Sequence, residues 1–78
     1  MIREHDRVVL RRDLSEGALR AGDVGTIVHI YEDGAAYEIE FCTLGGKTVT
    51  VATVASDDVR PVGENDLTHA RTVSRPSN

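Results

Sequence analysis

The chain is short of the features that mark most secreted, membrane and catalytic proteins. Among its 78 residues are one cysteine, two tyrosines, one phenylalanine and no tryptophan. A single cysteine cannot form an intramolecular disulfide, so the fold does not depend on an oxidising compartment. No segment approaches the roughly 18 apolar residues of a membrane helix, and the polar residues 1–6 lack the apolar core of a signal peptide. We therefore expect a soluble, cytoplasmic protein.

Positive charge is also scarce. Nine Lys and Arg stand against 13 Asp and Glu, which leaves a formal net charge of −4. This balance disfavours nucleic-acid binding, because such binding draws most of its affinity from neutralising phosphates. The length allows one small domain, and a domain of this size buries only about 60% of the surface of its unfolded chain. A deep, dry active-site cleft is therefore not expected.

No window of the sequence carries an apolar stripe with the 3.6-residue period of a helix. Apolar and polar residues alternate instead in short bursts, which is the period of half-buried strands. In the third burst Tyr37, Ile39 and Phe41 point to one side, predicted to be the core. Glu38 and Glu40 point to the other side, towards solvent. The predicted strands are residues 7–12, 24–32, 35–42, 48–52 and 59–62.

Glycines mark the turns between these strands. Asp33-Gly34 lies between two apolar runs and predicts a tight hairpin, because glycine adopts positive φ without steric cost. In the segment Gly-Asp-Val-Gly-Thr, we interpret Gly22 as a turn residue. For Gly25 two interpretations stay open, a β-bulge or a close crossing of strands. These four residues are predicted to serve backbone geometry rather than ligand binding.

The pattern as a whole predicts an all-β fold, a small five-stranded SH3-like barrel over residues 1–62. It includes a long first loop at 13–23 and a short helical turn at 54–58 before the last strand. Pro61 suits the last strand only if that strand lies at a sheet edge. Residues 63–78 are polar and lose the alternation, so we expect a flexible C-terminal tail, disordered unless a partner orders it.

No cluster of residues points to catalysis or to a metal. His5, His29 and His69 fall in separate segments, without a second histidine or cysteine at metal-ligand spacing. Cys42 has no adjacent basic group that would stabilise a catalytic thiolate. We therefore predict no catalytic residue, no metal site, no cofactor and no enzymatic activity.

Several arginines gather in the first strand and first loop despite the acidic balance. Together with Tyr31, an aromatic ring predicted to face outward, they form a candidate partner-binding surface. An alternative is a solvated arginine face paired with acidic neighbours in the first loop. The residues of the candidate surface are Arg11, Arg12, Arg20 and Tyr31, with Arg7 as a further basic residue of the first strand.

The four segments 4–10, 22–28, 36–41 and 59–62 together resemble a family of small bacterial stand-alone domains of unknown function. The resemblance covers nearly all of residues 4–62 and implies an SH3-like barrel without an established activity. The Gly-Asp-Val-Gly-Thr segment is also similar to the KOW segment of ribosomal and transcription factors, and to the barrel subunit of photosystem I that contacts ferredoxin. The chain departs from KOW-type RNA binders in its acidity and its lack of a lysine-rich loop.

Three functions therefore stay open. The first is a non-enzymatic protein-interaction module with a partner of unknown identity, including self-association through strand edges or the tail. The second is a KOW-like RNA-binding module that uses Arg7 and the arginines of the candidate surface. The third is an antitoxin or immunity-type inhibitor, a role that small acidic stand-alone domains often have in bacteria.

Overall fold

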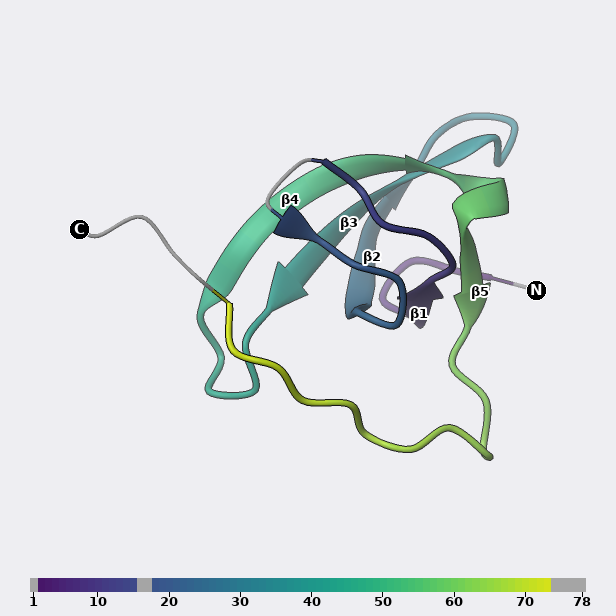
Figure 1. Ribbon diagram of the computed structural model, residues 1–78. Helices are drawn as coiled ribbons and strands as arrows, with labels where there is room; N and C mark the ends of the chain where they lie inside the picture. Colours follow the sequence, from purple (N-terminus) through teal and green to yellow (C-terminus); the bar gives the residue numbers. More distant parts are fainter. Residues whose placement is uncertain (1, 16–17, 74–78) are drawn as a thin grey trace.

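The computed structural model describes residues 2–15 and 18–73 and consists of one antiparallel five-stranded sheet (Figure 1). The sheet has the strand order β4-β3-β2-β1-β5, and a 3-10 turn, η2, precedes the last strand. This confirms the predicted small all-β fold with a helical turn before its last strand. The elements are β1 (Arg7–Leu10), β2 (Val24–Ile30), β3 (Ala36–Cys42), β4 (Thr48–Ala55), η2 (Ser56–Asp58) and β5 (Val59–Pro61).

The predicted alternation decides which side of the sheet becomes the core. Tyr37, Ile39 and Phe41 of β3 are all buried, and Ile39 is completely inaccessible to solvent. Glu38 and Glu40, between them, keep part of their surface exposed. Because successive side chains of a strand point to opposite faces, one face of the sheet is apolar. The sheet curves around this face (Figure 1). The core also contains Val8, Leu10, Leu19, Ile27, Ala52, Val54 and Val59.

The strand ends differ from the predicted ones by up to three residues. β4 continues to Ala55, whereas its alternation predicted an end at Ala52. It continues because β3 pairs with it from Cys42↔Thr48 to Ala36↔Ala55. Strand length thus follows from the neighbouring strand rather than from local polarity.

Gly25 is covered by side chains of the neighbouring strand β3. The β1–β2 register runs through it without a shift, from Arg7↔Thr26 to Val9↔Val24, so no bulge lies there. A Cβ atom at this position would overlap the Ile39 side chain and lie 2.8 Å from Cε1 of Phe41. Glycine is therefore required here by the packing of β2 against β3.

The predicted hairpin and turn are confirmed. Gly34 has a φ of 74°, and its N–H donates to the carbonyl oxygen of Tyr31 at 2.8 Å. Asp33 supports the turn by accepting the Ala35 N–H at 3.1 Å. Gly22, with a φ of 95°, also adopts the left-handed conformation that favours glycine.

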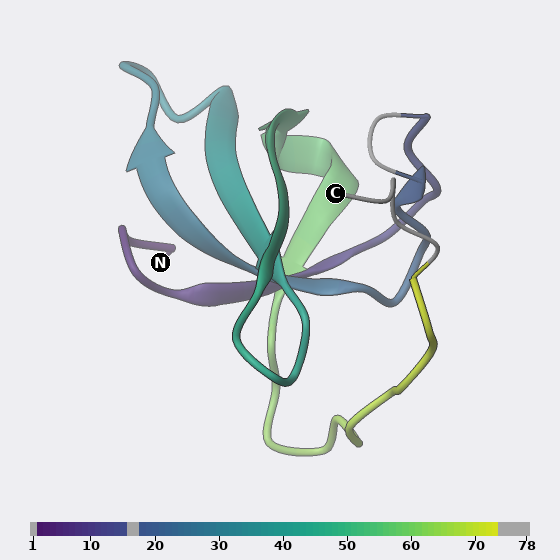
Figure 2. The same ribbon diagram turned by 90° about the vertical axis from the view of Figure 1, so that its left-hand side faces the viewer.

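After β5 the chain turns back and runs beside the sheet as an extended segment, which we call the strap (residues 63–73). Figure 2 shows it leading from the end of β5 towards the first loop. Within the predicted tail, residues 63–73 make the specific contacts described below. Residues 74–78 of the predicted tail lie outside the described residues. No helix in the described part of the chain has the length and apolarity to cross a membrane.

Candidate functional site

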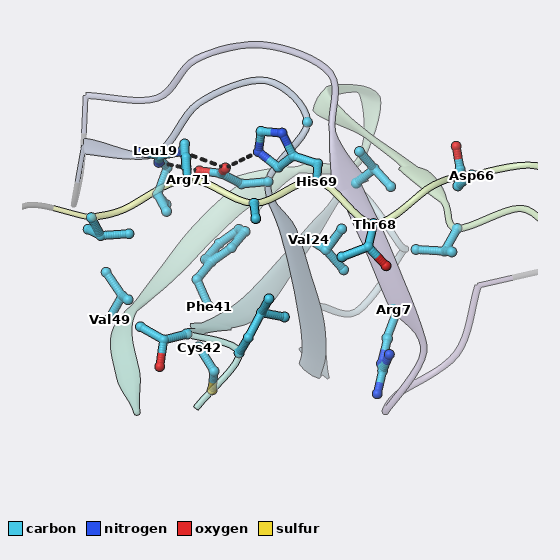
Figure 3. Close-up of a pocket in the computed structure, with 18 of the residues that line it drawn as sticks. Arg7, Leu19, Val24, Phe41, Cys42, Val49, Asp66, Thr68, His69 and Arg71 are labelled. Carbon is cyan, nitrogen blue, oxygen red and sulfur yellow. Dashed lines mark hydrogen bonds and ion pairs between the residues drawn. The ribbon is translucent and has the colours of Figure 1, made fainter. Parts of the chain in front are cut away.

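A groove of about 670 Å³ separates the strap from the outer face of the sheet (Figure 3). Its apolar lining includes Val9 of β1 and Val24 of β2. Val9 belongs to the outer face, because its neighbours Val8 and Leu10 point into the core, yet only 6% of its surface is exposed. Val9 is therefore largely shielded from water, although alternation alone would leave its side chain exposed.

Asp23 holds the far end of the strap. Its carboxylate receives two hydrogen bonds from Arg71, Nε to Oδ1 at 2.9 Å and Nη2 to Oδ2 at 2.6 Å. The Arg71 guanidinium also donates to the Ala18 carbonyl oxygen at 2.9 Å. Nε2 of His69 lies 3.2 Å from Oδ1, and the Arg20 N–H donates to Oδ2 at 2.8 Å. One carboxylate thus joins the strap to the turn that begins β2.

These contacts lower the pKa of Asp23. Burial opposes the charged carboxylate, but the hydrogen bonds from Arg71, from the Arg20 N–H and from His69 outweigh burial. The pKa of Asp23 therefore lies below its ordinary value of 3.8. The hydrogen bond to Asp23 likewise raises the pKa of Arg71. Both groups are charged at neutral pH, so the strap is held there by an ion pair.

A second ion pair holds the near end of the strap. Arg60 of β5 donates from Nη1 to Oδ2 of Asp66 and from Nη2 to Oδ1, both at 2.9 Å. The Gly63 N–H adds a hydrogen bond to the same carboxylate at 2.6 Å. The Arg60 hydrogen bonds, with the smaller effect of Gly63, lower the pKa of Asp66 to about 2. This pairing closes a short turn at the point where the chain leaves the sheet.

The Asp66 pair gives a pH dependence that can be tested. An aspartate whose folded pKa lies below its ordinary value stabilises the fold fully above pH 3.8 and loses this contribution as the pH falls through about 2. Arg60→Met should raise the pKa of Asp66 towards 3.8, because the guanidinium donors are lost. An NMR titration of the side-chain carboxyl carbon measures this, with Arg12→Met as a control that leaves Asp66 unchanged. A wild-type midpoint near 3.8 would contradict the pairing.

Two of the leucines that line the groove are unusually exposed. Leu44, on the β3–β4 hairpin, is 83% exposed and Leu67, on the strap, is 93% exposed. Val24 and Val62 line the same groove and remain 43% and 41% exposed. Exposed apolar side chains gathered along one groove are typical of interaction sites on small soluble proteins. The groove is therefore the strongest candidate for a binding site.

The arginines singled out in the sequence lie mostly elsewhere. Arg7 lines the groove and forms no ion pair with any described residue, whereas Arg60 and Arg71 of the groove are both paired. Three others, Arg11, Arg12 and Arg20, are exposed and do not line the groove. Arg12 lies 3.6 Å from the Asp58 carboxylate on η2. Their role in partner binding stays a prediction.

Tyr31 also lies outside the groove. It follows β2, is 39% exposed, and its hydroxyl donates to Oε1 of Glu38 at 3.3 Å. Its ring meets the His29 ring edge-on with the centroids 4.7 Å apart. Tyr31 is thus exposed as predicted, but neither contact identifies a ligand.

The remaining reactive side chains do not form a cluster. Cys42 lines the groove, but Figure 3 shows it well apart from His69. Its sulfur lies 3.9 Å from Oγ1 of Thr48. Within residues 2–15 and 18–73, no three His, Cys, Asp or Glu side chains gather as metal ligands would.

Comparison with known proteins assigns the chain to a family. Residues 4–61 match the family model described as "Domain of unknown function (DUF4926)", and the chain belongs to this family. No curated protein and no solved structure matched the chain. The match ends at β5, so Asp66, His69 and Arg71 of the strap lie beyond it.

Proposed function

We propose that this member of a family of unknown function is a non-enzymatic protein-interaction module that binds an extended segment of a partner protein in the groove beside the strap. The observation that carries the proposal is the apolar groove with two exposed leucines, Leu44 and Leu67, among its lining residues. Water-exposed leucines reduce solubility, and their burial against a partner makes the free energy of binding more favourable. An inhibitor of another protein would be one form of this function.

The groove also suggests what the partner segment contains. Arg60 and Arg71 are already neutralised by carboxylates of this chain, whereas Arg7 forms no ion pair with a described residue. A bound segment would therefore combine apolar side chains, which cover the leucines, with an acidic side chain near Arg7. The partner is thus an extended apolar segment that carries a carboxylate.

Selection from a library of displayed random peptides tests this proposal. Peptides rich in aliphatic residues with an aspartate or glutamate should be enriched, and Leu44→Asp and Leu67→Asp should weaken their binding at least tenfold. Arg7→Glu should remove the preference for acidic residues while apolar binding persists. Val28→Asp is the matched control, because Val28 is 39% exposed but does not line the groove. Selected peptides that bind the leucine variants unchanged would refute the proposed site.

RNA binding is the second candidate, carried by Arg7, Arg11, Arg12 and Arg20. The net charge of −4 opposes it, and Arg12 lies near Asp58. Phosphate contacts make such binding fall steeply with salt. A gel-shift titration with single-stranded RNA at low and moderate salt separates the two functions. Binding that weakens with salt and is lost in Arg11→Glu would favour RNA, whereas no binding at low salt would exclude it.

A further inference from the structure

The two edges of the sheet differ in how well they are protected. β5 is three residues long and contains Arg60 and Pro61, a charge and an imino acid that both discourage further pairing. β4, at the other edge, is eight residues long with the sequence TVTVATVA. It contains no charged residue and no proline, although natural proteins generally place such residues on long edge strands. β4 therefore remains open to a further strand.

The hydrogen bonds to β3 define which groups of β4 point outward. The Ser56 N–H donates to the Ala35 carbonyl oxygen at 2.9 Å, next to the pair Ala36↔Ala55. Because backbone groups alternate sides along a strand, even-numbered residues from Thr50 to Val54 bond to β3, and the odd-numbered residues between and after them face away. The outward groups belong to Val51, Thr53 and Ala55, and no backbone hydrogen bond outside the sheet reaches them from a described residue. These three residues are also exposed.

We propose that β4 is a dimerisation edge, through which two copies of this chain pair antiparallel and join their sheets into one. An antiparallel pair of identical strands has a two-fold axis and uses the same surface on both copies. The outward groups of Val51 and Thr53 then bond to those of Thr53 and Val51 of the second copy. No like charges meet along the paired strands, because β4 carries none.

Charges at the two ends of β4 select one register. Lys47 precedes the strand, and the acidic pair Asp57 and Asp58 follows it in η2. When the two strands are centred on Ala52, the Thr48 end of each copy lies beside the η2 end of the other, which brings Lys47 of one copy near the acidic pair of the second. Asp58 lies 3.6 Å from Arg12, so Asp57 is the carboxylate available to Lys47. A second copy supplies this match of opposite charges at both ends at once.

Removing one outward N–H tests the edge itself. Sedimentation equilibrium of the wild-type chain should show a species of twice 8.5 kDa that increases with concentration. Thr53→Pro should shift the protein to a monomer, because it deletes a bond to the second copy and none to β3. Thr53→Val, which keeps the N–H, is the matched control and should dimerise. Far-UV circular dichroism confirms that both variants fold.

A second variant keeps the test decisive if the proline variant fails to fold. Val51→Lys combined with Thr53→Lys places like charges opposite each other in the dimer and should give a folded monomer. A wild-type chain that stays monomeric at about 100 μM, where even a weak strand pairing is populated, overturns the proposal. A dimer that survives both the proline and the lysine variants overturns it as well.

An exchange of charges tests the register. Lys47→Asp alone and Asp57→Lys alone should each weaken dimerisation about tenfold, because two symmetry-related pairs become repulsive. The double variant, with both charges exchanged, should recover the wild-type affinity. The two side chains of one copy lie at opposite ends of an eight-residue strand, too far apart to interact in salt. Recovery therefore reports contact between copies, and its failure overturns the proposed register.

Discussion

Gly25→Ala should lower the free energy of unfolding by about 3 kcal/mol, at the upper end of the usual cost of overpacking a core. The added Cβ would overlap the Ile39 side chain and lie 2.8 Å from Cε1 of Phe41. Neither side chain can move away easily, because both are buried in the core. A domain of this length has a total stability of only about 4–12 kcal/mol, so the loss is a large share. Urea unfolding followed by circular dichroism measures it.

Gly45→Ala is the matched control for this prediction. A Cβ at Gly45 would lie 3.8 Å from Oγ1 of Thr43, an ordinary contact, and should change stability by less than about 1 kcal/mol. Ile39→Leu moves the overlapping methyl group and should recover part of the loss in the Gly25→Ala background. Equal stability of the two alanine variants would show that strand packing is not what requires glycine at position 25.

Asp23→Ala should release the strap and lower the free energy of unfolding by about 2 kcal/mol. The side chain is 12% exposed and its partner Arg71 is 23% exposed. Hydrogen bonds to charged groups contribute roughly 1.5–3 kcal/mol each, and the partial exposure of Arg71 reduces this value. Trypsin should then cleave after Arg71 much faster than in the wild type. Amide hydrogen exchange across residues 68–72 should accelerate in parallel.

Two comparisons separate release of the strap from general destabilisation. Arg71→Ala should reproduce the effect, and the double variant should add little to either change, because both remove the same ion pair. Asp33→Ala, which removes a hydrogen bond in the β2–β3 hairpin, should leave the rate of cleavage unchanged. Since the pKa of Asp23 lies below 3.8, the wild type should resemble Asp23→Ala only as the pH falls below that value. Unchanged exchange across the strap in Asp23→Ala would contradict this role.

Local patterns were sufficient to predict the strands and the side of the sheet that is buried. Tyr37, Ile39 and Phe41 show this most clearly, because alternation across a strand is a property of the backbone. The turn at Asp33-Gly34 was predictable for a similar reason, since positive φ favours glycine. By contrast, β4 extends to Ala55 because β3 provides a partner. The local sequence near Ala55 does not predict this extension.

The candidate site was not predictable in the same way. Arg71 and Asp23 are separated by 48 positions in the chain, and nothing in the Gly-Asp-Val-Gly-Thr segment that contains Asp23 predicts a contact with Arg71. The strap has no apolar period, so composition indicates disorder, although two ion pairs anchor it. The predicted partner-binding residues Arg11, Arg12, Arg20 and Tyr31 were chosen for charge and exposure, and none of them lines the groove.

The sequence by itself determined the all-β class, the turn at Asp33-Gly34 and the inward face of β3. These follow from steric and hydrophobic preferences that act within a few residues. Only the tertiary structure decided the packing of β3 side chains over Gly25, the path of the strap along the groove, and the contrast between a blocked and an open edge. Each of these depends on which distant segments meet, and that outcome is set by the packing of the whole sheet.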